Sequence, residues 1–487
     1  MDGLMPLHRT RIVWTLFFLV TLEALFSVPL LSWELAVGAG RLSGVWIALG
    51  ASLVICFVLW RWLPLWRRVL AFVSARLGNI STKHLFWFSF LFGVILRVLW
   101  VLAYPAPQHS DQAAYFGLAR NLVEQHSYSV SQGGLAYWPP GYPFFLAVWF
   151  LVFGFKTWVP ILANLILFGA SLLVVERLAR RIGGAPAANL AMLLLAVWPT
   201  MVMTAGMASK EMLVLFLLGL ALLVFFNAQE AGWTPPGVLL AILTGVLLAF
   251  ASLTQPSLLL FPSVLLAAEW FRKERLTVAI PRLCIVGIAL CLVIFPWTLR
   301  NHRVLGAWVP ISTNGGDVFY RANNPLATGG YTPAGEQSLE GLSEVDRGKA
   351  GFRLGKEWIR AHPGKFLALA VRKQVLFLGD DAQGAFETLK RGLNIGGLPY
   401  VAWKGVCNLY WWLLWIAILL LLAVQWRQRL LESAPLASVM LGILYLYTIH
   451  SVFESGAKYH EPLIALFVVV AAQVVANADG SGEIPAR

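Results

Sequence analysis

Residues 85–143 read LFWFSFLFGVILRVLWVLAYPAPQHSDQAAYFGLARNLVEQHSYSVSQGGLAYWPPGYP. The apolar run Leu85–Tyr104 is long enough to cross the roughly 30 Å hydrocarbon core of a membrane, and it leads directly into the polar stretch Gln108–Pro143. Asp111 follows the apolar run closely, which places its carboxylate near the membrane surface. Because a carboxylate at that position is costly unless it is paired or used, we expect this polar stretch to carry the chemistry.

The composition indicates a polytopic membrane protein. Of the 487 residues, 59% are hydrophobic and 13% are charged, and the mean hydropathy is +0.72, which is outside the range of soluble globular domains. The 37 Lys and Arg residues outnumber the 24 Asp and Glu residues, but they cluster in short loops between apolar runs, where they orient helices. We therefore expect contacts with membrane lipids and no nucleic acid partner.

Twelve apolar segments are predicted to span the membrane, with both termini on the cytoplasmic side. They are Ile12–Leu31, Val45–Leu63, Leu85–Tyr104, Val159–Leu178, Ala187–Thr204, Met212–Phe226, Val238–Leu253, Leu258–Phe271, Leu283–Trp297, Trp403–Val424, Leu436–His450 and Pro462–Val475. A further apolar stretch, Tyr142–Phe153, has a length more typical of interfacial or re-entrant segments. Assigning it to the outer loop keeps the basic segments Arg67–Lys83 and Arg177–Arg181 on the same, cytoplasmic side.

The predicted fold class is therefore an all-α polytopic membrane protein with about twelve transmembrane helices, outer-face juxtamembrane helices and a small soluble outer segment. We divide the chain into two extra N-terminal transmembrane helices (1–84), a transmembrane core with catalytic outer loops (85–299), an outer-face soluble or interfacial segment (300–399) and C-terminal transmembrane helices (400–487). Within the outer segment, Leu342–His362 and Gly364–Leu378 have helical spacing.

Several short motifs occur in an order that resembles the GT-C glycosyltransferases, in the branch of the protein O-mannosyltransferases and the lipid A aminoarabinose transferase. The motifs are His109-Ser110-Asp111-Gln112 with Tyr115 and Leu118-Ala119-Arg120, Trp138-Pro139-Pro140-Gly141-Tyr142-Pro143, Ser209-Lys210-Glu211, Pro296-Trp297 with Arg300-Asn301, Pro310-Ile311-Ser312-Thr313-Asn314-Gly315-Gly316, Asn323-Asn324-Pro325 and Lys458-Tyr459-His460. Together they extend over most of the chain from Leu85 onward.

This resemblance implies a GT-C arrangement of transmembrane helices, an inverting transfer and a polyprenyl-phosphate-linked sugar as donor. It also implies a catalytic acidic residue in the first outer loop and a second acidic residue in the next outer loop. The first loop of the family commonly reads Asp-Glu, whereas this chain has Asp111-Gln112. The spans before Leu85 are additional to the family pattern.

Asp111 and Glu211 are the acidic residues that the predicted topology places at the outer mouth of the helices. Transfer of a sugar from a lipid phosphate to a hydroxyl requires a base near the nucleophile, and we expect Asp111 to be that base. Asp111 could instead cap a helix or pair with Arg120. We expect Glu211 to position the acceptor, although a carboxylate in the first turn of a helix is also favourable on electrostatic grounds.

A departing phosphate requires cations, and several lie on the predicted outer face. Lys458 is our first candidate for the lipid phosphate, because basic residues that flank a span usually face inward and this one does not; it could also be an interfacial anchor. The other substrate-binding candidates are His460, His109, Tyr115, Lys210, Arg300 and Tyr459.

Two ionisable residues, Glu23 and Arg97, fall inside predicted spans. Because each is expensive alone in a membrane, we expect them to form an ion pair that holds the first helix against the third. The alternative places Arg97 near a lipid headgroup.

The sequence thus predicts a multi-pass protein of the cell inner membrane that transfers a sugar from a polyprenyl-phosphate donor to a glycan, lipid or protein acceptor on the periplasmic or outer face. A lipid-glycan transporter or flippase, and a glycan ligase or polymerase that uses a lipid pyrophosphate donor, remain alternatives. No cofactor is expected. A divalent metal is possible but not indicated, because no close His spacing supports it.

Overall fold

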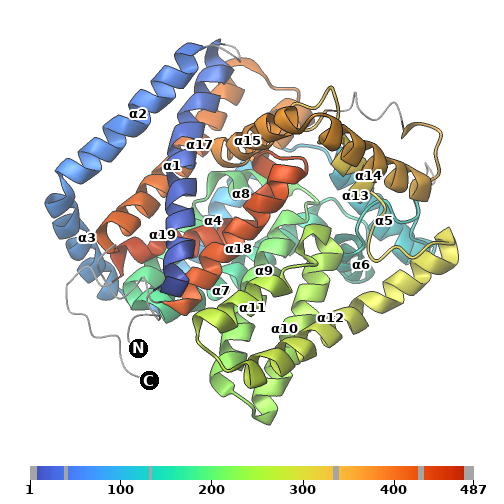
Figure 1. Cartoon of the computed structure of the whole chain (residues 1–487), viewed down its shortest axis with the longest axis horizontal. Helices are drawn as coiled ribbons and strands as arrows, with labels where there is room; N and C mark the ends of the chain where they lie inside the picture. The colour runs from blue at the N-terminus through green and yellow to red at the C-terminus, as the bar shows by residue number, and fades with distance from the viewer. Residues whose placement is uncertain (1–7, 38–41, 131–133, 333–338, 426–432, 477–487) are drawn as a thin grey trace.

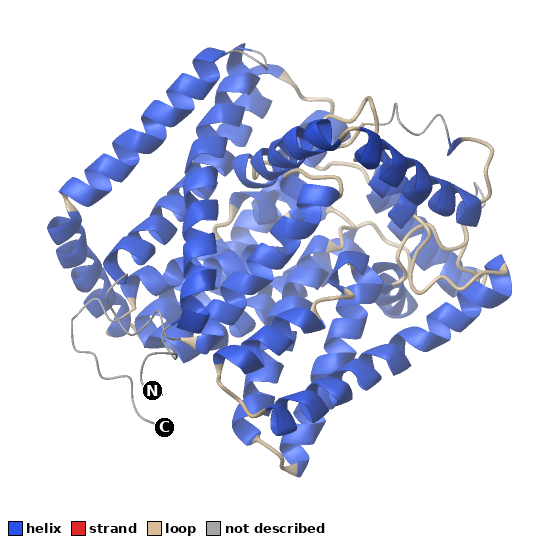
Figure 2. Cartoon of the chain, in the orientation of Figure 1, coloured by secondary structure: helices blue, strands red, loops and turns tan. Residues whose placement is uncertain are grey.

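The computed structural model describes residues 8–37, 42–130, 134–332, 339–425 and 433–476, which form helices and turns without any strand (Figure 2). The longer helices are α1 (His8–Val37), α2 (Leu42–Arg61), α3 (Leu63–Gly78), α4 (Thr82–Ala103), α5 (Ser110–Glu124), α6 (Gly141–Phe153), α7 (Trp158–Ala196), α9 (Glu211–Ala231), α10 (Pro235–Thr254), α11 (Pro262–Phe271), α12 (Leu276–Leu305), α14 (Glu344–Ala361), α15 (Pro363–Gly379), α17 (Gly397–Gln425), α18 (Ala434–Val452) and α19 (Ile464–Ala472). The predicted all-α polytopic class is confirmed.

Short helical segments connect these helices. They are α8 (Pro199–Met203), η1 (Thr204–Gly206), η2 (Pro256–Leu258), α13 (Gly315–Arg321), α16 (Gln383–Ala385), the π-helix η4 (Phe386–Gly392), η6 (Ala457–Tyr459), η7 (Glu461–Leu463) and η8 (Gln473–Val475).

Ten helices in the described residues are long and apolar enough to cross a membrane, so the chain is a multi-pass membrane protein. Two shorter apolar helices, Gly141–Phe153 and Pro256–Phe271, accompany them. The first corresponds to the stretch that we assigned to the outer loop, and the second to the predicted span Leu258–Phe271. The total of twelve crossings stays a prediction.

Helix α7 folds back on itself at Gly184, whose φ of 74° and ψ of −164° lie outside the helical region and suit only glycine. Before this turn, Asn164 donates from its Nδ2 to the carbonyls of Ala205 (3.0 Å) and Met207 (2.8 Å), which come after the turn. The two halves of α7 therefore run antiparallel. This agrees with two separate spans, Val159–Leu178 and Ala187–Thr204, in the prediction.

Helices α9 and α19 occupy the centre of the bundle. No residue of α19 is more than 1% exposed, and α7, α9, α17 and α18 surround it. By contrast, α2 lies at the edge of the molecule and exposes Leu53 (61%) and Trp60 (72%) (Figure 1). Apolar side chains exposed along a spanning helix face the lipid.

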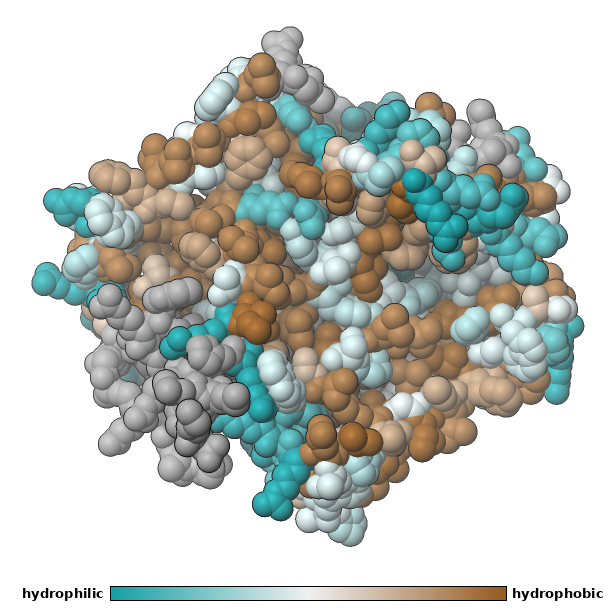
Figure 3. All heavy atoms as spheres, viewed as in Figure 1, coloured by the Kyte–Doolittle hydropathy of each residue, from teal (hydrophilic) through white to brown (hydrophobic). Residues whose placement is uncertain are grey.

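The outer segment contains the two helices that its periodicity predicted, α14 and α15, which lie along one edge of the molecule (Figure 1). Polar side chains gather on the surface over α14 (Figure 3). Helix α15 is fastened to the bundle by Arg372, which pairs with Glu34 of α1 at 2.9 Å. Lys373 is buried and donates from Nζ to Asn323 Oδ1 (3.0 Å) and the Val452 carbonyl (2.9 Å); its burial lowers its pKa to about 7.

The predicted ion pair between Glu23 and Arg97 is wrong. Glu23 accepts a hydrogen bond from the Tyr447 hydroxyl at 2.5 Å. The Arg97 Nη1 donates to the carbonyls of Gly93 (3.0 Å) and Ala196 (3.1 Å), and its guanidinium lies 3.7 Å from the centre of the Phe168 ring. Arg97 is therefore accommodated by backbone carbonyls and an aromatic face rather than by a carboxylate.

Two stretches singled out in the sequence lie on helices. The basic stretch Arg67–Lys83 is mostly helical, because α3 extends to Gly78 and α4 starts at Thr82. Arg300 lies within α12, which continues to Leu305. The division of the chain into four parts stays a prediction.

The topology can be tested by cysteine labelling in a background where the native cysteines are replaced by alanine. With a membrane-impermeant thiol reagent, we expect Thr328→Cys to be labelled in intact cells and Arg275→Cys only after permeabilisation, because the basic α11–α12 connection should be cytoplasmic. A tag inserted after Gly184 should also be cytoplasmic. Detection of that tag outside would mean that α6 spans the membrane, and would contradict the arrangement of the outer loops.

Candidate active site

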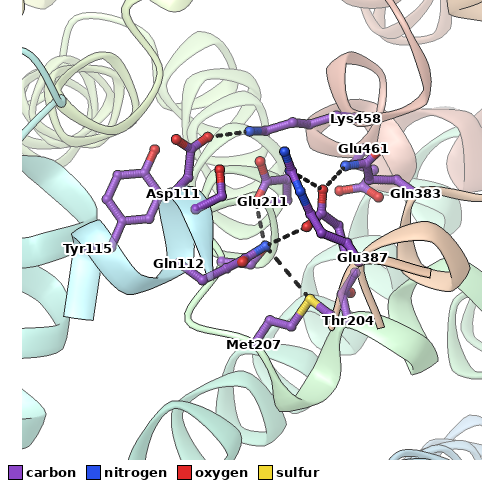
Figure 4. A pocket seen from close by; sticks show the side chains of 13 residues that line it. Asp111, Gln112, Tyr115, Thr204, Met207, Glu211, Gln383, Glu387, Lys458 and Glu461 are labelled. Carbon is purple, nitrogen blue, oxygen red and sulfur yellow. Dashed lines mark hydrogen bonds and ion pairs between the residues drawn. The ribbon is translucent and has the colours of Figure 1, made fainter. Parts of the chain in front are cut away.

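One pocket collects most of the charged residues that the sequence placed at the outer mouth (Figure 4). It encloses about 410 Å³ of space, its open mouth included, and is formed by segments from four parts of the chain. Its lining residues are Ser110, Asp111, Gln112, Tyr115, Thr204, Met207, Ser209, Glu211, Gln383, Glu387, Arg391, Lys458 and Glu461.

Asp111 lies in the first turn of α5 and forms an ion pair with Lys458, whose Nζ is 2.6 Å from Asp111 Oδ2. The Trp138 indole also donates to Asp111 Oδ1 at 3.3 Å. Lys458 holds the pKa of Asp111 well below its usual range, against the opposing effect of burial. The two side chains are 40% and 32% exposed, so a substrate can reach the pair from the pocket mouth.

The backbone on both sides of this ion pair has unusual conformations. Ser110 has a positive φ of 48°, which is uncommon for a residue other than glycine, at the start of α5. Gly456, two residues before Lys458, has φ 150° and ψ −178°, a conformation that is essentially confined to glycine. Glycine adopts its conformation without strain, whereas the positive φ of Ser110 is held by the surrounding structure.

Glu211, the second predicted acidic residue, lines the same pocket from the first turn of α9 and accepts a hydrogen bond from the Ser209 hydroxyl. Tyr115 also lines the pocket, and burial raises the pKa of its phenol, so the hydroxyl stays protonated. Lys210 is adjacent but does not line the pocket; its Nζ donates to Gln255 Oε1, and burial lowers its pKa to about 8.

His109 lies behind the pocket wall, with its Nε2 2.7 Å from Glu387 Oε2 and its Nδ1 3.0 Å from the Pro107 carbonyl. The structure therefore brings Asp111, Glu211, Tyr115 and Lys458 into one pocket and places His109 and Lys210 next to it.

Three of the predicted substrate-binding residues lie elsewhere. His460 is fully buried, with its Nδ1 2.7 Å from the Phe377 carbonyl and its Nε2 2.9 Å from Asp381 Oδ1. Tyr459 packs its ring against that of His450. Arg300 donates to the carbonyls of Leu135 (2.6 Å) and Tyr128 (2.9 Å), so its guanidinium holds the outer loop together.

The pocket also contains residues that the sequence analysis missed, above all Glu387, Arg391 and Glu461. Glu461 lies between the motif Lys458-Tyr459-His460 and the predicted span Pro462–Val475. Its position at the end of a span was a signal that could have identified it. Glu387 and Arg391 lie on η4, whose seven residues are too few to show a helical period.

Within the described residues, no group of three or more His, Cys, Asp or Glu side chains is arranged to hold a metal ion. Asp111, Glu211 and Glu387 are engaged by Lys458, Ser209, His109 and the Gln112 amide. Our expectations about cofactors stay predictions.

Sequence comparison gives a partial family match. Residues 138–299, about a third of the chain, match the family model described as dolichyl-phosphate-mannose-protein mannosyltransferase. The matched region contains Trp138 and Glu211 but neither Asp111 nor Lys458. A comparison with curated protein sequences gives no match.

Solved structures show the likeness in fold. The Archaeoglobus fulgidus oligosaccharyltransferase in its apo form aligns with a TM-score of 0.52 and 13% identity over 81% of this chain and 50% of that chain. The same enzyme tethered with an acceptor peptide containing the NVT sequon aligns with a TM-score of 0.51 and 14% identity, over 82% of this chain and 50% of that chain. ArnT from Cupriavidus metallidurans bound to undecaprenyl phosphate aligns with a TM-score of 0.34 and 16% identity, over 80% of this chain and 77% of that chain.

This chain thus covers about half the length of the oligosaccharyltransferase chains that it matches. At such low identity the likeness concerns the fold. The chain has a membrane fold similar to that of the Archaeoglobus fulgidus oligosaccharyltransferase, in agreement with the fold that the ordered motifs indicated.

The reassignment of His460 to a structural pair can be tested through its partner. Asp381 is fully buried and accepts hydrogen bonds from His460 and from the Trp198 indole (2.9 Å). Asp381→Asn removes one partner of this buried ion pair, and we expect a loss of about 3 kcal/mol of stability, seen as a lower Tm in detergent.

Asp380→Asn is the matched control, because Asp380 pairs with Lys404 at 2.7 Å but is 23% exposed. It should cost about 1 kcal/mol. Equal Tm values for the two variants would contradict the structural role of the buried pair.

Proposed function

We propose that this chain is a membrane glycosyltransferase of GT-C type that transfers a sugar from a polyprenyl-phosphate-linked donor to an acceptor on the periplasmic or outer face of the inner membrane. The observation that carries the proposal is the pocket where two carboxylates, Asp111 and Glu211, meet the cation Lys458. The family match supports the class of donor, because the name of the matched family contains dolichyl-phosphate-mannose.

In this proposal Asp111 is the general base. The acceptor hydroxyl oxygen bonds to the anomeric carbon of the sugar while the bond from that carbon to the phosphate oxygen breaks. The hydroxyl proton goes to the Asp111 carboxylate, and the electron pair of the broken bond leaves with the polyprenyl phosphate. Attack opposite the phosphate inverts the anomeric carbon. Glu211, in the same pocket, positions the acceptor.

Lys458 connects donor binding with activation of the base. Paired with Lys458, Asp111 has a low pKa and is a weak base. A donor phosphate that takes over the Lys458 ammonium removes this stabilisation of the carboxylate, and the pKa of Asp111 then rises. The base becomes stronger when the donor is in place, because the same cation serves first the carboxylate and then the phosphate.

The acceptor is a glycan, a lipid or a protein. The oligosaccharyltransferase structure that carries an acceptor peptide makes a peptide one acceptor to test. The alternative from the sequence, a glycan ligase or polymerase that takes its sugar from a lipid pyrophosphate donor, is tested alongside.

The decisive experiment incubates the purified protein with a panel of polyprenyl-phosphate sugars and, in parallel, lipid pyrophosphate sugars, and measures the release of lipid phosphate. Release from a polyprenyl-phosphate sugar is expected. Release only from the pyrophosphate donors would indicate the ligase. Movement of donor across vesicle membranes without any release would indicate a flippase.

Substitutions at the ion pair should separate chemistry from binding. Asp111→Asn keeps the shape of the side chain but removes its proton affinity, so transfer should fall by roughly two to four orders of magnitude while donor binding survives. Lys458→Ala should weaken donor binding by about 1.5–3 kcal/mol through loss of a charge-assisted contact to phosphate. Both variants should first be checked by thermal unfolding. Near wild-type transfer by Asp111→Asn would make Glu211 the leading candidate for the base.

The pH dependence of transfer offers an independent check. Since Lys458 lowers the pKa of Asp111, its removal raises that pKa, and the base is then protonated at a higher pH. We therefore expect the acid limb of the kcat/KM profile to move to higher pH in Lys458→Ala. Lys458→Arg keeps a cation and should retain the wild-type limb. An unchanged limb in Lys458→Ala would show that Asp111 is not the group that titrates.

A further inference from the structure

Glu387 is the pocket carboxylate with the largest set of hydrogen-bond donors. His109 Nε2 (2.7 Å) and Gln112 Nε2 (3.3 Å) contact its Oε2, while Gln383 Nε2 (2.8 Å) and Arg391 Nη1 (3.2 Å) contact its Oε1. Its side chain is only 8% exposed. With both oxygens engaged by protein groups, Glu387 is suited to hold its neighbours in place rather than to contact a substrate.

These donors include the two residues that flank Ser110 and Asp111 in sequence. His109 precedes them and Gln112 follows them, and both contact the same oxygen of Glu387. The backbone between them contains the positive φ of Ser110. Glu387 therefore ties both ends of the unusual turn that presents Asp111 to the pocket.

His109 links Glu387 to the segment that leads into α5. Its Nε2 lies 2.7 Å from Glu387 Oε2, and its Nδ1 lies 3.0 Å from the Pro107 carbonyl. The imidazole therefore bridges η4 and the residues just before α5.

The π-helix η4 places Glu387 at this point. Its wide turns let Glu387 and Arg391, four residues apart, both line the pocket. Thr388 donates to the Met203 carbonyl at 2.9 Å. A side chain on Gly392 would meet Ala106 Cβ at 2.9 Å, so η4 packs closely against the start of α5.

We propose that Glu387 is a positioning residue for Asp111: through His109 and Gln112 it fixes the turn that holds the catalytic carboxylate, and through Arg391, on the same helix η4, it fixes a cation that also lines the pocket. This inference rests on the proposed function, because it assigns Asp111 the role of base. The chain thereby has a second carboxylate beside the segment that contains Gln112.

Exchanging the side chains of Gln112 and Glu387, which face each other, tests the positioning role of Glu387. In Glu387→Gln, an amide replaces the carboxylate and one of its N–H groups meets the donors of Gln112 and His109, so kcat should fall by about 100-fold through misplacement of the base. The KM for donor should change by less than about threefold, since Lys458 remains. Gln112→Glu alone places two carboxylates face to face and should also lose activity. The double variant Gln112→Glu/Glu387→Gln restores one carboxylate facing one amide. Its kcat should be at least about tenfold higher than that of Glu387→Gln.

The matched control is Glu269→Gln, which removes a buried carboxylate paired with Arg282 at 2.6 Å outside the pocket. It should lower Tm without changing kcat. Wild-type kcat in Glu387→Gln would overturn the proposal. A loss of kcat that follows the loss of Tm, without recovery in the double variant, would overturn it as well, because it would indicate a purely structural role.

A second readout does not depend on sugar transfer. Carbodiimide modification of Asp111, followed by mass spectrometry, should accelerate in Glu387→Gln as the turn loosens, and return toward the wild-type rate in the double variant. A wild-type protein that transfers no sugar would contradict the proposed function, whereas the modification rate would still test Glu387. Equal rates in wild type and Glu387→Gln would overturn the positioning role.

Discussion

The ion pair between Asp111 and Lys458 joins two segments that are 347 residues apart in sequence, and the pocket exists only where these segments meet. One comes from the polar stretch after α4 and the other from the turn before α19. Each charge at the mouth of a membrane bundle would be costly alone. Their pairing stabilises both segments and leaves a site where one cation serves either a carboxylate or an incoming phosphate.

The outer segment supports this pair from above the membrane. Glu344 at the start of α14 accepts from the backbone of Leu135 and Ala136, close to the Trp138 that contacts Asp111. Arg321 of α13 pairs with Glu454 at 3.0 Å, in the loop that leads to Lys458. Each half of the site is thus braced by one helix, α14 on the Asp111 side and α13 on the Lys458 side, and these two helices pack against each other.

The sequence was informative where a charge directly borders a long apolar run. Asp111, Glu211 and Lys458 were found in this way, because hydropathy and charge bias fix the ends of spans. It was less informative for neighbours such as His460 and Arg300, since residues close in sequence point in different directions and only packing decides which one reaches the pocket. Glu387 could not be predicted, because it lies on a short π-helix whose sequence shows no helical periodicity. The partners of Glu23 and Arg97 were missed because a hydroxyl and backbone carbonyls leave no charge pattern in sequence.

The central position of α19 has a consequence for biosynthesis. This helix is buried on all sides and is made after the other helices described, together with Lys458 and Glu461 immediately before it. Until it emerges from the ribosome, α7, α9, α17 and α18 lack their common packing partner, and Asp111 lacks its counter-charge. Completion of the bundle and completion of the pocket are therefore the same late event in the synthesis of the chain.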